Sequence, residues 1–397
     1  VDVTQNVAKV ELYESLYSPY LTGDILITDN SNLLSNIPLL GQEKINIGWR
    51  YQDKAISLEF FAGEISEIKS MNDNYGGYVI KLVSPKLYYN SINTFSRSYS
   101  GRNSQIIADI HSDFLQQDIE VISDGGTSHQ VVFPYIKPYG AIEMMLKNTY
   151  AVDTTPLFVY ETVNSNAVKM QSLGDMVLGE SLVLSNVQTS NIDEYTGQGQ
   201  RETAGFGPTI DEQVIKRAHP TFKNIKDGLY ASNISEFDIS EKRYEELRFN
   251  YKDHTPDLSP ANVNYIRDNF QLDDVPLHER YTAKRRFYLR DRKAYNSSVG
   301  NLYNVDSISR TAAEAYYKTL NNTSVRINSD PHPDLEVGGM IYLRFNRMVP
   351  NIDEERDEDP YRSGDYVCFA IKHTIAGTKY NLTLEAVRSG IAQQVGE

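Results

Sequence analysis

One pattern occurs twice in this chain, once near each end. Each copy has a turn in which Leu precedes Gly, then an alternating strand, and later a strand that reads Tyr-x-apolar-x-Leu. The residues of the first copy are Leu39, Leu40, Gly41, Ile45-Asn46-Ile47 and Tyr78 to Leu82. The residues of the second copy are Leu335, Gly338, Ile341-Tyr342-Leu343 and Tyr380 to Leu384. A β-domain duplicated within one chain is typical of a ring-forming subunit, because three copies would place six similar domains around one axis.

Both copies lie in stretches where apolar and polar side chains alternate, which predicts antiparallel strands. Residues 7–94 show this alternation throughout, with the turn residues Asp73 to Gly77 before the closing strand. The strands of the second copy are predicted at Val325 to Ile327, Ile341 to Phe345, Tyr366 to Ile371 and Leu382 to Ala386. The polar run from Asn351 to Arg362 predicts a longer hairpin loop in the second copy.

The patterning between the two copies is mixed. In residues 95–152 we predict two helices, the first capped by Ser104 and the second following Pro138, because apolar residues recur there at helical spacing. Short strands resume at Leu157 to Tyr160 and Ala167 to Met170. Residues 191–308 combine a glycine-rich loop, charge, proline and short β-like runs. A helix predicted over 309–320 leads into the second copy.

Composition restricts the function more than the fold. The chain has 397 residues, of which 40% are hydrophobic, so a protein of several domains with ample core material is expected. Its net charge of −14 argues against a protein built to grip nucleic acid, since phosphate binding needs clustered Lys and Arg. Tyrosine is abundant, with 28 Tyr against 14 Phe. Tyrosine favours half-buried sheets and wet interfaces, so this excess fits a β-rich fold.

Cysteine use and hydropathy bear on the compartment. The single cysteine, Cys368, excludes an intramolecular disulfide and is predicted to be a small core residue on a strand. No stretch reaches the roughly 18 apolar residues that a membrane helix needs, so we expect no membrane insertion. The first residues lack the basic region and apolar core of a signal peptide, and none is expected.

Several motifs could carry chemistry, and each has a simpler structural interpretation. The Gly197-x-Gly199 and Gly205-x-Gly207 pairs lack the following Gly-Lys-Ser/Thr of a phosphate loop, so a mobile loop is favoured. The run Asp330-Pro331-His332-Pro333-Asp334 offers metal ligands but reads as a rigid loop. His373 lies in a predicted strand, and its companions form no short ligand spacing. No nucleophile elbow is present, and none of the 53 acidic residues is singled out as a catalytic pair.

Two charged runs remain. A basic run is interleaved with aromatic residues from Arg280 to Lys293, and an acidic run extends from Asp353 to Asp359. The basic run is interpreted as a strand with solvated cations or a docking patch for an acidic neighbour, rather than a nucleic-acid site. The acidic run is interpreted as a solvated hairpin tip, with a negative wall facing DNA or a partner as the alternative. The sequence therefore predicts no catalytic, cofactor-binding or metal-binding residues, and no enzyme.

The order of these elements resembles the central baseplate hub protein of contractile-tailed phages, with the T-even hub as the type case. It also resembles the hub part of type VI secretion spike proteins. The local likeness is greatest over residues 309–390, with the turn-strand Asp334 to Leu343 and the strand containing Tyr366, Ile371 and His373. The segment from Pro156 to Met170 fits a second-domain hairpin. The motifs at Leu21 to Ile25 and Pro38 to Glu43 fit the first domain.

The resemblance implies a mainly β fold with α+β inserts, built on two tube-type antiparallel β-barrel domains with a helical insert and a mixed insertion. The expected divisions are 1–94 for the first barrel, 95–152 for the helical or α+β insert, 153–190 with 309–391 for the discontinuous second barrel, 191–308 for the mixed insertion, and 392–397 for a tail.

The function implied is that of a structural hub, a ring-shaped homotrimer that adapts a sixfold tail tube to a threefold spike and lets DNA pass. The implied partners are further copies of the chain, a separate trimeric spike protein, and the tail tube or its initiator. Tape-measure and baseplate wedge proteins are additional partners, and DNA is expected only in transit, without specific binding. The location would be the virion tail baseplate, reached from the host cytoplasm during assembly. Two alternatives stay open, a β-rich carbohydrate-binding or adhesion module and a glycan hydrolase.

Overall fold

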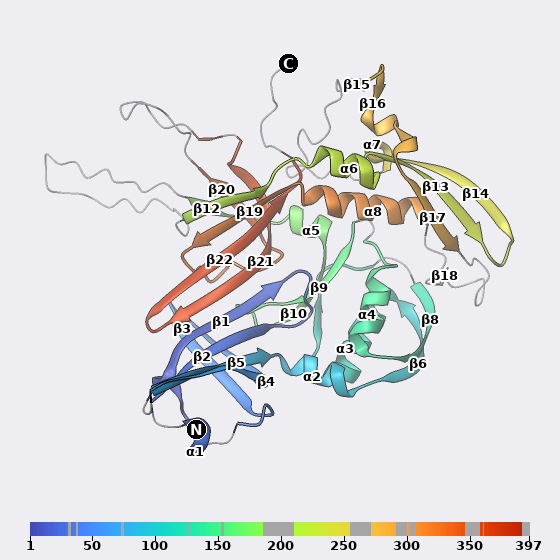
Figure 1. Ribbon diagram of the computed structural model, residues 1–397. Helices are drawn as coiled ribbons and strands as arrows, with labels where there is room; N and C mark the ends of the chain where they lie inside the picture. The colour runs from blue at the N-terminus through green and yellow to red at the C-terminus, as the bar shows by residue number, and fades with distance from the viewer. Residues whose placement is uncertain are drawn as a thin grey trace, which may run out of the picture.

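The computed structural model describes most of the chain, and the residues it describes fold mainly as β-sheet (Figure 1). The described residues are 1–30, 33–36, 39–72, 75–125, 128–151, 155–185, 210–254, 271–290, 300–301, 306–345, 358–359 and 361–390. The predicted fold class, mainly β with α+β inserts, is confirmed. The predicted glycine-rich loop at 197–207 and residues 353–357 of the acidic run lie outside the described residues.

The first part of the chain forms a five-stranded antiparallel unit, here called the first unit. Its strands are β1 (Val7–Ser15), β2 (Thr22–Asp29), β3 (Lys44–Tyr51), β4 (Lys54–Asn72) and β5 (Tyr75–Val83). They pair in the order β1-β2-β5-β4-β3. Alternate side chains point to one buried cluster, as a strand period of two requires. A short helix, α1 (Leu33–Asn36), lies between β2 and β3.

The second unit has the same strand order, although its strands come from two separate parts of the sequence. They are β12 (Ile210–Arg217), β19 (Thr323–Ser329), β20 (Met340–Arg344), β21 (Gly364–Ala376) and β22 (Lys379–Arg388). The order is β12-β19-β22-β21, with β20 on the other side of β21. β11 (Ser181–Ser185) adds a parallel strand to β20. The sequence analysis did not assign β12, which falls inside the predicted mixed insertion.

Three details show that the two units repeat each other closely. Ile45 and Ile341 occupy equivalent strands, β3 and β20. β4 carries a bulge after Ala62 and β21 carries one after Cys368, at the same place relative to the neighbouring strand. The turn residues Gly41 and Gly338 both have φ of +83°, a left-handed conformation that favours glycine. The repeat predicted from the sequence is therefore present in the strand order and in the turn geometry. Its closing motifs were matched two residues out of register, because the strand pairings make Tyr78 of β5 equivalent to Leu382 of β22 and not to Tyr380.

The two units share one continuous sheet, because β1 of the first unit pairs antiparallel with β21 of the second. Residues Val10 to Ser15 lie opposite Ala370 to Ile375. In Figure 1 the first unit, in blue, lies below the second unit, in red and orange. The sequence analysis placed the two copies in separate barrel domains, with inserts between them, and did not predict this direct hydrogen bonding between the units.

The segment after the first unit folds as a small α+β layer beside it. Its elements are α2 (Pro85–Ile92), β6 (Phe95–Arg102), α3 (Asn103–Leu115), β7 (Ile119–Val121), β8 (Ser128–Ile136) and α4 (Pro138–Leu146). The two predicted helices, α3 and α4, are present, but Ser104 does not cap the first. Helix α2 lies inside residues 7–94, where the sequence predicted only strands, so that prediction was wrong from Pro85 to Ile92. The N-cap position belongs to Arg102, and the Ser104 hydroxyl, inside the helix, donates to Asp124 at 2.6 Å.

The predicted hairpin follows, with β9 (Leu157–Glu161) antiparallel to β10 (Val168–Ser172) and then α5 (Leu173–Val177). β10 also pairs in parallel with β7 of the preceding layer. The hairpin thus belongs to two neighbours: β9 contacts β1 of the first unit, while β10 extends the α+β layer. Buried side chains of this hairpin contribute to three of the hydrophobic clusters.

The third sheet and its helices occupy the other end of the molecule (Figure 1). The sheet contains β13 (Ala231–Asp238), β14 (Arg243–Asn250) and β17 (Arg285–Arg290). Long helix α8 (Ser307–Leu320) lies against it; Ala312 and Ala315 pack on this sheet, whereas Tyr316 and Leu320 join the core of the second unit. α8 therefore connects two hydrophobic cores. The smaller elements here are α6 (Thr221–Asp227), α7 (Tyr251–His254), β15 (Gln271–Leu272) and β16 (Val275–Pro276). β18 (Gly300–Asn301) instead pairs in parallel with β8 of the α+β layer.

Candidate functional site

The seam between the two units is the first candidate site, because it holds a buried polar network. Glu14 of β1 and His373 of β21 are both enclosed, with the carboxylate Oε1 3.3 Å from Nε2 of the ring. The other carboxylate oxygen accepts the backbone N–H of Val163 at 2.7 Å. The His373 Nδ1 atom lies 2.7 Å from the hydroxyl of Tyr380, whose pKa is raised by burial and by the Glu14 charge.

This network fixes how the two units meet. An isolated buried charge is costly, and a buried pair is tolerated only when further hydrogen bonds satisfy its remaining atoms. A shift of β1 against β21 by one residue would remove Glu14 from His373 and turn it to the other face of the sheet. The sequence contains a signal for it, since Glu14 interrupts an alternation whose preceding members, Val10 and Leu12, are apolar.

A second buried ion pair ties the first unit to its neighbours. Lys86 of α2 and Glu161 of β9 form a salt bridge, with side chains 8% and 3% exposed. The remaining oxygen of Glu161 accepts the backbone N–H of Leu21 at 2.9 Å. One carboxylate therefore holds together the start of β2, helix α2 and the hairpin. Sequence reasoning gave no indication of this pair.

The loop of Asp330 to Asp334, a possible metal site by sequence, has a structural role. The Tyr51 hydroxyl donates to the Pro331 carbonyl at 2.7 Å, and Lys54 Nζ donates to the Pro333 carbonyl at 3.1 Å. The loop thus joins the second unit to the β3–β4 turn of the first. Across the part of the chain that the structure describes, no group of three or more His, Cys, Asp and Glu side chains could hold a metal ion.

The polar face of the shared sheet is the second candidate site, since it carries cross-strand ion pairs in both units. In the first unit Lys81 of β5 lies 2.9 Å from Asp24 of β2. In the second unit Glu385 of β22 lies 3.0 Å from Arg326 of β19. The strand pairings make Lys81 equivalent to Glu385, and Asp24 equivalent to Arg326, so the charges are inverted between the units.

A third ion pair crosses the seam on the same face. Glu11 of β1 lies 3.2 Å from Lys9 and 3.3 Å from Lys372 of β21. Burial alone would raise the pKa of Glu11, but the two ammonium groups outweigh it and hold the pKa below its usual value. Cations and anions are thus interleaved on this face. It presents a balanced pattern, although the whole chain is acidic.

The basic run binds acidic residues of the same chain. Its strand, β17, alternates between two faces. On the inner face Arg286 reaches Glu314 of α8 at 2.7 Å and Arg290 reaches Glu236 at 2.9 Å. On the outer face Arg285 pairs with the exposed Glu246. Arg286 therefore ties the third sheet to α8, whereas Arg285 and Arg290 pair with acidic residues of the sheet itself. Residues 291–293 of the basic run lie outside the described residues.

The described end of the acidic run also has partners. Glu358 accepts the hydroxyl of Tyr342 at 2.5 Å, and burial together with this carboxylate raises the pKa of Tyr342 to about 12. Asp359 binds the Arg362 side chain and the N–H of Tyr361. These two carboxylates therefore anchor the end of the loop to the second unit. Cys368 is fully buried, as predicted, and burial raises the pKa of its thiol.

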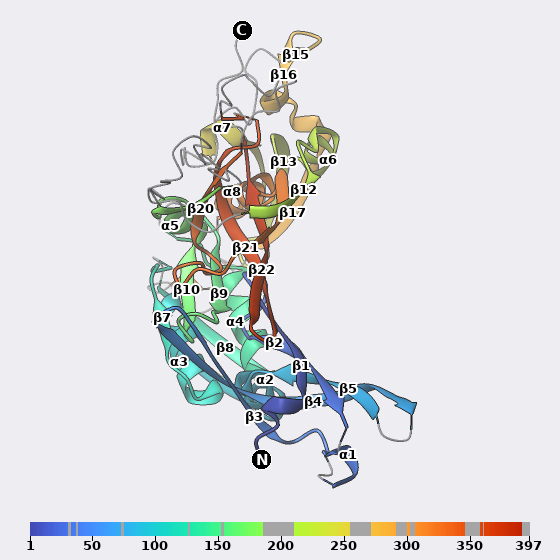
Figure 2. The same cartoon turned by 90° about the vertical axis from the view of Figure 1, so that its left-hand side faces the viewer.

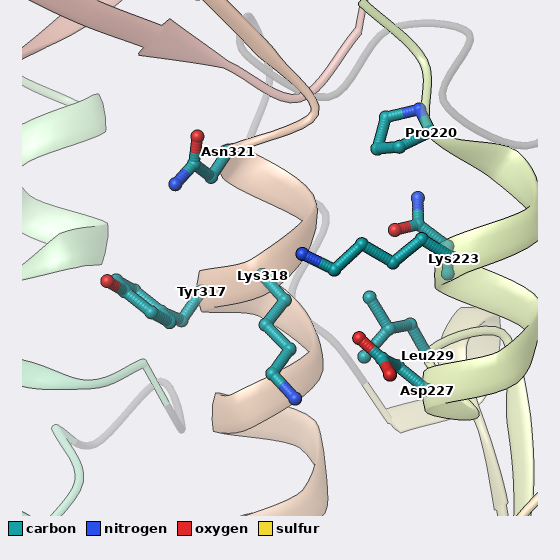
Figure 3. A pocket seen from close by; sticks show the side chains of 8 residues that line it. Pro220, Lys223, Asp227, Leu229, Tyr317, Lys318 and Asn321 are labelled. Atoms are coloured by element: carbon teal, nitrogen blue, oxygen red, sulfur yellow. The ribbon is translucent and has the colours of Figure 1, made fainter. Parts of the chain in front are cut away.

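A small cavity of about 90 Å³ lies between α6 and α8. Figure 3 shows Lys223 extending from α6 toward α8, with Asp227 below it. The lining residues are Pro220, Lys223, Asn224, Asp227, Leu229, Tyr317, Lys318 and Asn321. The arrangement offers two ammonium groups and one carboxylate, without a base and nucleophile in contact. It is a gap between two helices, far smaller than a typical ligand pocket of about 300–1,000 Å³.

Comparison with known proteins identifies related folds. No family model and no curated protein matches the sequence. Among the described residues, no helix has the length and apolar content to cross a membrane. The structure is similar to that of a tail protein from Neisseria meningitidis, with a TM-score of 0.53 and 7% identity over 97% of this chain and 93% of that chain.

Two further neighbours have lower scores. The 43 kDa tail protein of prophage MuSo2 from Shewanella oneidensis has a TM-score of 0.49 and 8% identity, over 96% of this chain and 94% of that one. An E. coli component of the type VI secretion system has a TM-score of 0.48 and 9% identity, over 97% of this chain and 74% of that one. The fold of this chain is thus similar to that of a solved tail protein over nearly its full length.

Proposed function

We propose that this chain is the structural hub at the centre of a phage tail baseplate, acting as a ring-shaped homotrimer. The ring would adapt a sixfold tail tube to a threefold spike, and DNA would pass through its channel. The observation that carries the proposal is the pair of units with one strand order inside a single chain. The likeness in fold to a solved tail protein supports the same assignment.

Symmetry explains why such a duplication is useful. Closed contacts repeat with the symmetry of the ring, so a sixfold tube and a threefold spike cannot share one simple interface. A trimer of a duplicated chain offers six similar units to the tube and three whole chains to the spike. The seam built on Glu14 and His373 would hold the two units of each chain at a fixed angle.

The proposed partners follow from this position. They are the other two copies, the trimeric spike protein, and the tail tube or its initiator, with tape-measure and baseplate wedge proteins at the periphery. DNA is proposed only as cargo in transit, and the balanced ion pairs of the sheet face suit a surface that does not hold phosphates. The location would be the virion tail baseplate, after assembly in the host cytoplasm. The domain division given above remains part of this proposal, as does the absence of catalytic activity.

The mass of the protein in solution is the first test. Light scattering or native mass spectrometry should give three times the mass of one chain, and electron-microscopy class averages down the axis should show a ring with a central channel. A stable monomer at the concentration of an assembled particle would refute the hub. Turnover of peptidoglycan or another glycan that one carboxylate substitution abolishes would favour the hydrolase alternative instead.

A further inference from the structure

Inside one chain, the two units meet where β1 pairs with β21. The strands equivalent to β1 and β21 in the opposite units do not pair with each other in the single chain. Within the chain, the outer edge of β1 pairs with the second half of β21, residues Ala370 to Ile375. The strand order makes β12 the equivalent of β1, because each lies beside the strand that follows it in the unit, β19 or β2. By the same comparison, the second half of β4 is the equivalent of the second half of β21.

Both counterparts are open edges in the part of the chain that the structure describes. β12 is the terminal strand of the large sheet, with β19 on one side only. β3 pairs with β4 from Lys54 to Phe61, so the edge of β4 from Glu64 to Lys69 is bordered only by β5, on the opposite side. Figure 2 shows the far ends of β4 and β5 projecting from the body of the molecule, where a strand could reach them. An open edge presents unpaired N–H and C=O groups to another strand.

We propose that β12 of one copy pairs antiparallel with the second half of β4 of the next copy, repeating between chains the β1–β21 contact found within the chain. The inference rests on the proposed ring. Pairing of β12 with β4 would make the contact between chains nearly identical to the contact between units, so that one strand-pairing geometry repeats around the axis. The result would be a continuous circular sheet, without open edges where the units meet.

The register follows from the bulge that both units share. Counting from the bulges, Glu64 corresponds to Ala370, so Ile68 corresponds to Thr374. Thr374 faces Glu11 across the seam, and Glu11 corresponds to Val214. Val214 therefore comes opposite Ile68. A second irregularity in β4, between Ser66 and Lys69, allows a shift of one residue, which would bring Ile215 opposite Ile68 instead.

The side chains at these edges fit such a contact. Val214 and Ile68 are 49% and 62% exposed, which is unfavourable for apolar residues unless something covers them. In the register that places Ile215 opposite Ile68, Lys216 of β12 comes opposite Glu67 of β4; within the chain Lys216 binds Glu385, and Glu67 lies 3.9 Å from Lys69. Paired apolar side chains and opposite charges across two strands both stabilise a sheet.

Disulfide trapping tests the pairing directly. Ile68→Cys is combined in turn with Val214→Cys and with Ile215→Cys, while the native thiol, Cys368, is buried. Mild oxidation of the assembled protein should give covalent dimers and trimers, and no larger species, for at least one combination. The matched positive control is Glu11→Cys with Thr374→Cys, the equivalent pair within one chain, which should give a cross-linked monomer. Leu178→Cys with Ile239→Cys, exposed residues outside both edges, is the negative control.

A charge exchange provides the second measurement. Val214→Glu with Ile68→Glu should reduce the assembled mass from trimer toward monomer, because two carboxylates would face each other. Val214→Lys with Ile68→Glu should keep the trimer. Both positions are exposed in the single chain, so neither pair should lower the unfolding temperature of the monomer.

The outcomes separate the two proposals. A trimer without cross-links from either combination, or a trimer that tolerates the paired glutamates, overturns the β12–β4 contact and leaves the hub intact. A protein that stays monomeric with native residues at both edges overturns the hub and the contact together. Cross-linked trimers that the paired glutamates disrupt support the contact.

Discussion

The Glu14 carboxylate on β1 lies 3.3 Å from the imidazole Nε2 of His373 on β21, and both side chains are buried. These two residues are 359 positions apart, yet they meet where the two units of the chain join. The pair makes the junction selective, because only one register of β1 on β21 brings the carboxylate to the ring. The stability of the seam should therefore depend strongly on this single contact.

Glu14→Ala should lower the free energy of unfolding by about 1–3 kcal/mol, because it leaves the buried Val163 N–H without an acceptor and removes the carboxylate from His373 Nε2. Urea denaturation followed by circular dichroism measures the change. The control is Glu59→Ala, whose salt bridge to Lys44 is exposed and should be worth about 0–1 kcal/mol. Equal losses in the two variants would contradict a special role for the seam.

Gly41→Ala and Gly338→Ala form a matched pair, since both glycines have φ of +83°. A residue with a Cβ in this conformation costs about 1–2 kcal/mol, which both variants should show. At Gly338 the added Cβ would also lie 2.4 Å from the Tyr160 hydroxyl, whereas at Gly41 the nearest atom is 3.9 Å away. Gly338→Ala should thus be less stable by about 1–3 kcal/mol more. Calorimetry that ranks the two equally would mean that Tyr160 moves aside freely.

His111 should make the protein sensitive to mild acid. Burial lowers the pKa of this side chain below 6.5, while Nδ1 donates to the Gln117 carbonyl at 2.7 Å. The unfolded chain therefore binds the proton more readily, so the contribution of His111 is complete above pH 6.5 and declines as the pH falls toward the folded pKa.

His111→Asn offers an amide N–H toward the same carbonyl but has no titration in this range. Between pH 7 and pH 5 the native protein should lose more stability than this variant, as measured by urea midpoints at each pH. Parallel pH profiles for the two proteins would rule out His111 as the source.

Arginines on the two faces of β17 should contribute very differently to the stability of the protein. Arg286→Ala removes a nearly buried guanidinium that binds Glu314 and the Asp227 carbonyl, and should cost about 3–5 kcal/mol. Arg285→Ala, one residue away, removes an exposed pair with Glu246 and should cost less than about 1 kcal/mol. Thermal unfolding of both variants checks this. A larger loss for Arg285→Ala would mean that the outer face of the sheet is covered in solution.

The sequence predicted the elements whose signal is local. The Leu/Gly turns and the alternating strands around Ile45 and Ile341 were recognisable because a left-handed turn needs glycine and a half-buried strand needs period-two patterning. β12 was missed because the run from Ile210 to Arg217 mixes acidic, amide and basic residues without alternation. Its strand conformation comes from pairing with β19, a tertiary contact that overrides the local preference.

The polar contacts of the site were less accessible to prediction. Glu14 was visible as an acid among apolar neighbours, but its partner His373 could be found only by knowing that β1 and β21 adjoin. Nothing in the sequence around Lys86 or Glu161 indicated a buried ion pair, since each residue alone resembles an ordinary surface charge. The rigid-loop interpretation of Asp330 to Asp334 did not show that the prolyl carbonyls, rather than the carboxylates, bind the first unit. Such pairings depend on the topology, which a single sequence does not report.

The inverted ion pairs Lys81–Asp24 and Glu385–Arg326 affect how another protein could bind this face. The backbone repeats between the two units, but the charges at equivalent positions are opposite. A partner that recognises the backbone path would find the two units interchangeable, whereas a partner that recognises charge would find them opposite. A closed ring of three chains would therefore offer six equivalent positions to a partner that binds the main chain, but only three to a partner that binds through charge.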